Sequence, residues 1–120
     1  HGTTYGGNPL AGAAVNIVLD LFEENHIIDN VKETGAYLEA ALDSLAAEYA
    51  CIKTRRGGGL MQGLVFHRPV GDIITRALDK GLILINAGTD IIRFVPPLII
   101  TKEHVDEMTA ILRECLREEA

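Results

Sequence analysis

A first series of apolar residues recurs at i, i+3, i+4 and i+7, which is the spacing of one helix face. Asn8 and Pro9 precede the series. Asn caps free N–H groups at a helix start, and Pro fits the first turn. We therefore expect a helix over residues 9–24, whose apolar positions are Val15, Val18, Leu19 and Phe22.

A second apolar series predicts a long helix that ends near Tyr49. Asn25 and His26 separate the two series, and they either interrupt the chain between two helices or bend a single one. The two helices together are longer than so small a protein needs to cover a sheet, so the pair is expected to dock onto something else. The second series consists of Ile28, Val31, Gly35, Leu38, Leu42 and Leu45.

The pattern changes after residue 50 to short apolar runs broken by glycine and proline. Residues 51–56 and 61–66 are expected to be strands joined by glycines, and residues 72–80 a helix closed by Gly81. Residues 82–86 and 91–94 are two further expected strands, and Pro96 and Pro97 end the second one. A last helix begins near Thr101 and carries Val105, Met108, Leu112 and Leu116.

The resulting order is α-α-β-β-α-β-β-α. It predicts an α/β protein of the α+β type, with helices packed on one face of a small, mostly antiparallel sheet.

Composition excludes several classes of function. The 120 residues make one domain at most, and the formal net charge of −6 argues against binding to nucleic acid. The longest apolar run is too short to cross a membrane. The four histidines do not have metal-ligand spacing, so no metal site is expected. Two cysteines, without a CxxC pair, favour a cytoplasmic location.

Two segments carry candidate chemistry. The loop from Gly2 to Gly7 holds Thr3 and Thr4, whose hydroxyls beside a helix start suit a phosphate group, although a plain loop explains the same residues. Arg93 is the one charge in an apolar strand. Its guanidinium suits a carboxylate, unless it points outward or pairs with a nearby acid.

A third segment joins Arg55 and Arg56 to three glycines. These arginines either hold an anion or are exposed charges of a hairpin connection, and the hairpin is the favoured interpretation.

Three stretches, taken together, resemble the class III (ornithine-type) aminotransferases, which use pyridoxal 5′-phosphate. One stretch, residues 81–88 continued by residues 92–101, is similar to the branch of the family that acts on N2-acetylornithine, and the resemblance runs over the whole chain. The other two stretches are residues 1–11 (HGTTYGGNPLA) and residues 56–61 (RGGGLM).

The resemblance implies a dimeric or larger homo-oligomeric fold-type I enzyme. Such an enzyme moves the δ-amino group of N2-acetylornithine to 2-oxoglutarate, a step of arginine biosynthesis. Thr4 matches the residue that binds the cofactor phosphate across the dimer interface, and Thr3 matches the adjacent residue that contacts the substrate. Arg93 matches an arginine associated with the substrate α-carboxylate.

The resemblance also implies that the chain is the C-terminal part of a longer enzyme. Residues 1–24, the cofactor-phosphate loop and the first helix, would link to a large domain, and residues 25–120 would form the small domain. The Schiff-base lysine of the family lies upstream of the threonine loop. Lys32, Lys53, Lys80 and Lys102 match no motif for it, so we expect no catalytic residue in this chain and no activity of the chain by itself.

Other interpretations stay open at this point. Within the family, the chain could belong to an ornithine, succinylornithine or 4-aminobutyrate aminotransferase. Outside it, a freestanding α/β module that binds a small molecule, or a purely structural interface domain, fits the same pattern. In addition, the apolar first helix, with the small residues Ala11, Gly12 and Ala14, is expected to make the isolated chain self-associate.

Overall fold

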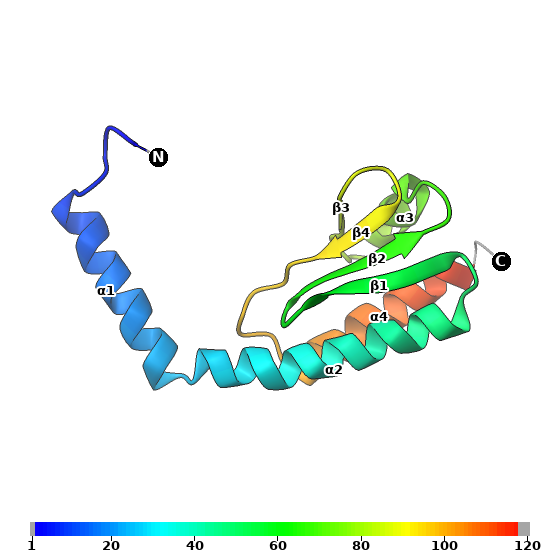
Figure 1. Cartoon of the computed structure of the whole chain (residues 1–120), viewed down its shortest axis with the longest axis horizontal. Coiled ribbons are helices and arrows are strands. Elements are labelled where there is room, and N and C mark those ends of the chain that lie inside the picture. The colour runs from blue at the N-terminus through cyan, green and yellow to red at the C-terminus, as the bar shows by residue number, and fades with distance from the viewer. Residues whose placement is uncertain (1, 118–120) are drawn as a thin grey trace.

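The computed structural model describes residues 2–117; His1, which opens the N-terminal motif, and residues 118–120 lie outside this range. The element order is the one that the sequence predicts (Figure 1). The helices are α1 (Pro9–Glu24), α2 (Ile27–Glu48), α3 (Gly71–Asp79) and α4 (Lys102–Arg117). The strands are β1 (Ile52–Gly58), β2 (Met61–Phe66), β3 (Ile85–Asn86) and β4 (Ile91–Phe94).

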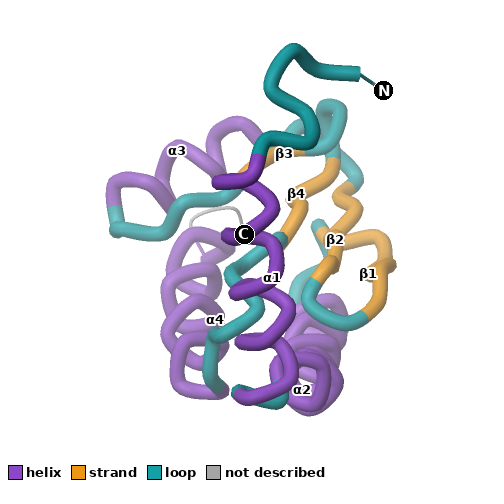
Figure 2. The backbone as a smooth tube through the Cα atoms, turned by 90° about the vertical axis from the view of Figure 1, so that its left-hand side faces the viewer, coloured by secondary structure: helices purple, strands orange, loops and turns teal. Residues whose placement is uncertain are grey.

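The four strands form one antiparallel sheet in the order β1-β2-β4-β3. Helices α2 and α4 lie side by side beneath one face of this sheet, and the opposite face carries no helix (Figures 1 and 2). The predicted arrangement of helices on one face of an antiparallel sheet is therefore confirmed.

The core lies between this sheet and the helices. Helix α2 contributes an apolar stripe at helical spacing, and β2 and β4 contribute alternate residues. Because α2 packs directly under the sheet, the expectation that both N-terminal helices serve another partner is wrong for α2. Fully buried members of the core include Leu42, Leu45, Leu64, Phe66, Ile92 and Leu112.

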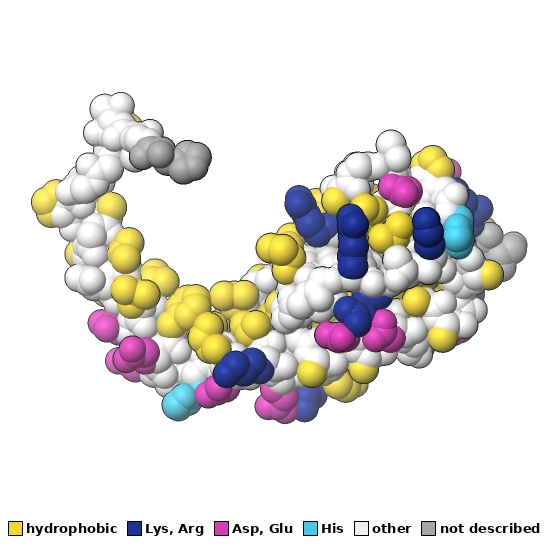
Figure 3. Space-filling view, viewed as in Figure 1, with side chains coloured by type: hydrophobic (Ala, Val, Ile, Leu, Met, Phe, Trp, Pro, Cys, Tyr) yellow, Lys and Arg dark blue, Asp and Glu magenta, His cyan; other side chains and the backbone are white. Residues whose placement is uncertain are grey.

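Helix α1 stands apart from this core and contains no buried residue. His26 separates it from α2, because this residue adopts a left-handed backbone with φ of 50° and so interrupts the helical path. Helices α1 and α2 therefore meet at an angle, and apolar side chains line the concave side of this bend (Figure 3). The structure therefore contains two helices here rather than one bent helix.

Strand β3 is shorter than the predicted strand over residues 82–86. Gly81 has φ of +86°, and the Leu82 N–H donates to the Ala77 carbonyl at 2.8 Å. This bond terminates α3 in the manner of a glycine C-cap, as predicted for Gly81. Leu82 therefore serves to end the helix, and pairing with β4 begins only at Ile85.

No helix in the described part of the chain is long and apolar enough to span a bilayer.

Candidate functional site

The N-terminal loop is a compact series of turns that leads into α1. The Thr3 hydroxyl accepts a hydrogen bond from the Tyr5 N–H at 3.3 Å, and the Asn8 amide donates to the Tyr5 carbonyl at 2.8 Å. The Asn8 side chain also accepts from the Ala11 N–H at 2.9 Å, which is the predicted N-cap. These bonds fix the loop relative to the first turn of the helix.

Thr3 and Thr4 are both exposed on this loop. The Thr4 hydroxyl makes no hydrogen bond to a described residue, so it is free to donate to an anion. Residues 2–7 are all exposed, and a Cβ placed on Gly2 or Gly7 would meet no described atom within 4 Å. The loop therefore offers donors to a phosphate without forming the walls of a pocket.

Arg93 lies on the sheet, far along the chain from this loop. Its neighbours in the ladder are Gly63 of β2 and Ile85 of β3, and it alternates with the buried residues Ile92 and Phe94. The side chain is therefore exposed on the face without helices, and it pairs with no acid among the described residues. Of the interpretations of Arg93, the outward orientation agrees with its exposure, and pairing with a nearby acid is wrong for the described residues.

Arg93 is among the residues that line two cavities. One is an apolar cavity of about 410 Å³ at the β3 edge, and Ile83, Ile85 and His104 are among its lining residues. The other is a groove of about 490 Å³ on the open face of the sheet, where Arg56 and Gly63 contribute to the lining. Arg93 thus lines both cavities, whereas Thr3 and Thr4 line neither of the two, and their loop precedes α1 at the N-terminal end of the chain (Figure 1).

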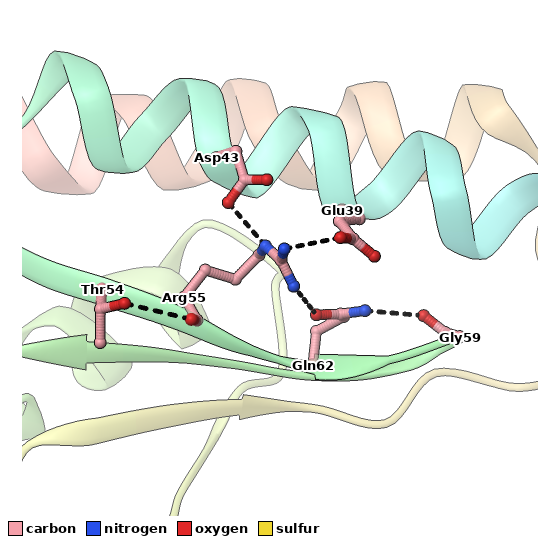
Figure 4. Close-up of polar contacts among 6 residues, drawn as sticks. All are labelled: Glu39, Asp43, Thr54, Arg55, Gly59 and Gln62. Atoms are coloured by element: carbon pink, nitrogen blue, oxygen red, sulfur yellow. Dashed lines mark hydrogen bonds and ion pairs between the residues drawn. The ribbon is translucent and has the colours of Figure 1, made fainter.

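The two adjacent arginines of β1 have different environments. The Arg55 Nε lies 2.6 Å from Asp43 Oδ1, and one terminal nitrogen lies 2.6 Å from Glu39 Oε1 (Figure 4). The other terminal nitrogen donates to Gln62 Oε1 at 3.0 Å, and the Gln62 amide donates to the Gly59 carbonyl. The hydrogen bond to Asp43 raises the pKa of Arg55 above its usual value. Arg55 therefore holds the hairpin to α2.

The expectation that both arginines are exposed charges is therefore wrong for Arg55, and the acids at i and i+4 on α2 are the sequence signal for its role. Arg56, in contrast, is exposed beside the open groove. The predicted hairpin is confirmed, because β1 and β2 pair directly across a turn at Gly59.

The remaining groups offer little chemistry. Within residues 2–117, no three His, Cys, Asp or Glu side chains are placed to hold a metal ion. The cysteines are free thiols: Cys115 is buried and Cys51 half-buried. All four lysines are exposed, and Lys102 is bound to Glu33 at 2.6 Å, which raises the pKa of the lysine.

Comparisons with known proteins give consistent results. The family described as "Aminotransferase class-III" matches residues 1–116. An acetylornithine aminotransferase from Gloeobacter violaceus is 46% identical over 114 residues, which cover 93% of this chain and 28% of that protein. The chain thus spans less than a third of the length of this curated relative.

Solved structures agree with this match. The lysine aminotransferase from M. tuberculosis superposes with a TM-score of 0.91 at 28% identity, covering 100% of this chain and 28% of that one. The ornithine δ-aminotransferase from Plasmodium falciparum gives a TM-score of 0.88 at 32% identity, covering 98% of this chain and 31% of that one.

Proposed function

Because this chain belongs to the class-III aminotransferase family, we propose that it is the C-terminal part of a pyridoxal-phosphate-dependent aminotransferase. The complete enzyme would transfer the δ-amino group of N2-acetylornithine to 2-oxoglutarate, as a step of arginine biosynthesis. The observation that carries this proposal is the match of residues 1–116 to the family together with 46% identity to an acetylornithine aminotransferase.

A second amino donor is the main alternative. The structural neighbours include a lysine aminotransferase and an ornithine δ-aminotransferase, at 28% and 32% identity. Curated relatives from several organisms, at 39–46% identity, are acetylornithine aminotransferases. Their agreement supports N2-acetylornithine as the donor.

Thr4 is proposed to bind the cofactor phosphate, and Thr3 to contact the substrate. The Thr4 hydroxyl is exposed and points to no described acceptor, as a phosphate ligand requires. The Thr3 hydroxyl accepts from Tyr5, so its own proton stays available to an acceptor on the substrate. The loop thus fits the phosphate group through hydroxyl donors at a helix start.

Arg93 is proposed to bind the α-carboxylate of the substrate. Its exposure on the open face of the sheet and its lack of a described acidic partner support this role. A guanidinium can donate two parallel N–H bonds to one carboxylate, which fixes both the position and the orientation of the bound acid.

The remaining elements of the proposal concern the whole protein. When bound, pyridoxal phosphate supplies the electron sink for amino transfer. Residues 1–24 would carry the phosphate loop toward a large domain, and residues 25–120 would form the small domain. The lysines here are exposed surface residues, so we expect the chain to be inactive without that large domain.

We also propose that the enzyme assembles as a homodimer or larger homo-oligomer, and the position of the loop supports this. A Cβ on Gly2 or Gly7, in the loop of Thr3 and Thr4, would meet no described atom within 4 Å, so we expect complementary groups to come from another domain or a sister subunit. A cytoplasmic location is part of the same proposal, and the two free thiols support it.

A substrate panel on the complete enzyme tests this function. With 2-oxoglutarate as acceptor, we expect kcat/KM to be highest for N2-acetylornithine and lower for ornithine, succinylornithine, lysine and 4-aminobutyrate. A higher kcat/KM for any of these competitors would reassign the donor. The absence of amino transfer to 2-oxoglutarate from every donor would contradict the proposal as a whole.

A further inference from the structure

The register of the sheet places two arginines on either side of one glycine. Arg56 of β1 pairs with Gly63 of β2, and Gly63 pairs in turn with Arg93 of β4. Residues paired directly across antiparallel strands project to the same face of the sheet. Arg56 and Arg93 therefore share the face without helices, with their Cα atoms roughly 10 Å apart, two strand spacings.

These two cations have no counter-ions in the described part of the chain. Both side chains are exposed, and neither makes an ion pair or hydrogen bond with a residue between 2 and 117. No described Asp or Glu lines the groove between them, although acids outnumber Lys and Arg by 17 to 11 in the sequence. The groove is thus a local concentration of positive charge on an acidic protein.

Gly63 forms the floor of this groove, and the fold does not require glycine there. Its φ is not positive, and a Cβ at this position would meet Ile91 Cγ2 at 3.6 Å and two carbonyl oxygens at 3.7 Å, which are ordinary contacts. Strand interiors favour β-branched residues over glycine. A glycine in such a place is typical of a close approach by a ligand or another backbone.

We propose that Arg56 is a second carboxylate-binding residue, which together with Arg93 holds one substrate carboxylate above Gly63. This inference rests on the proposed role of Arg93 and extends it. The two oxygens of a carboxylate accept about four hydrogen bonds, enough for two guanidinium groups. The negative charge also offsets the repulsion between the two arginines, and apolar Ile91 and Ala87 on the same groove suit the carbon chain.

Binding to the chain itself is the first test. Nuclear magnetic resonance of the isotope-labelled 120-residue protein would follow the Arg56 and Arg93 Nε–H signals and the Gly63 amide during titration with 2-oxoglutarate. We expect all three to shift together and to saturate. In Arg56→Ala, the chemical-shift change of the Arg93 signal at a given 2-oxoglutarate concentration should be at least threefold smaller.

Chloride and inorganic phosphate are the comparison anions, at matched ionic strength. Equal shifts with chloride, or a stronger response to phosphate, would contradict a carboxylate site. Unchanged Arg93 shifts in Arg56→Ala would exclude Arg56 from it. Lys53→Ala is the matched control, because it removes one exposed charge from the same strand outside the groove.

Steady-state kinetics of the complete enzyme is the second test. Arg56→Ala is expected to raise KM for 2-oxoglutarate at least tenfold with a less than threefold change in kcat, whereas Lys53→Ala leaves both unchanged. Gly63→Val should have the same effect by filling the floor of the groove, while both arginines are retained. Native amide spectra of each variant separate this effect from a loss of folding.

The outcomes distinguish this inference from the proposed function. If Arg93→Ala raises KM but Arg56→Ala and Gly63→Val do not, the shared site is wrong and the function of the enzyme stands. If the complete enzyme transfers no amino group, the function is wrong, and the titration of the chain still decides whether the two arginines bind a carboxylate together.

Discussion

At the scale of single residues, the contrast between Arg55 and Arg56 depends on one irregularity in β1. Ile52 is buried against the helices, and strict alternation from it would direct residue 56 inward and residue 55 outward. The register shift between Ile52 and Thr54 reverses this order, so that Arg55 meets the acids of α2. A bulge of this kind flips every following side chain to the other face.

Removal of the Arg55 side chain is expected to destabilise the fold. Arg55→Ala would leave Gln62, which is only 2% exposed, without its guanidinium partner, and would leave Glu39 and Asp43 without a counter-ion. We expect the free energy of unfolding to fall by about 1–2 kcal/mol, because the two carboxylates are half exposed. Chemical denaturation measures this change.

Arg113→Ala is the matched control, since the Arg113 side chain is 36% exposed, against 15% for Arg55, and pairs with Glu48 alone among the described acids. This substitution should lower the free energy of unfolding by less than about 1 kcal/mol. An equal loss of stability in the two variants would show that the Arg55 network has no special structural role.

The sequence suggests roles for Thr3, Thr4 and Arg93, but it does not indicate that Arg56 lies across Gly63 from Arg93. Hydroxyls in a glycine loop and a lone charge in an apolar strand are local signals, readable without a fold. The row from Arg56 through Gly63 to Arg93 depends on strand order and register, which place residues 37 positions apart side by side. Neither order nor register is encoded in any short segment.

At the scale of elements, helix boundaries were predictable because their signals are local. The first helix has the predicted bounds, since Asn8 caps it and Pro9 occupies its first turn. The start of strand β3 was not predictable from local signals, because the residues after Gly81 first complete the end of α3. Whether Asn25 and His26 break or bend a helix is decided by a single backbone angle, which composition does not determine.

The contact between α2 and the β1–β2 hairpin depends on Gly35. A Cβ at this position would lie 2.8 Å from the Gly59 backbone, so that helix and hairpin would have to move apart. Gly35→Ala is expected to lower the free energy of unfolding by about 1–3 kcal/mol, despite the better helix propensity of alanine. Thermal unfolding followed by circular dichroism measures this loss.

Gly12→Ala provides the comparison on α1, where a Cβ meets nothing within 4 Å. This variant should keep or slightly raise stability through helix propensity alone. If Gly35→Ala behaves in the same way, α2 and the hairpin are not in tight contact.

At the scale of the whole molecule, the chain is elongated, with extents of 54 × 32 × 24 Å, because α1 extends away from the core. Exposed apolar residues along α1 include Leu10, at 81% exposure, and Leu19, at 59%. A patch of this kind is unusual on a monomer and favours association with another surface. The N-terminal loop is carried at its far end (Figure 1).

The isolated chain is therefore expected to self-associate through α1. Sedimentation velocity over a range of concentrations should show species larger than 13.0 kDa. The double substitution Val15→Ser with Val18→Ser should shift the distribution toward monomer. Ile83→Ser, which changes an exposed apolar residue away from α1, should not. A strictly monomeric profile at high concentration would contradict this prediction.

The affinity of the complete enzyme for pyridoxal phosphate tests the central claim most directly, because the claim assigns the Thr4 hydroxyl to the cofactor phosphate. Thr4→Ala is expected to weaken cofactor binding about tenfold or more, the usual effect of losing one hydrogen bond to a charged group. Thr4→Ser, which keeps the hydroxyl, should stay near the wild-type value. A dissociation constant of Thr4→Ala equal to that of the wild type would contradict the assignment.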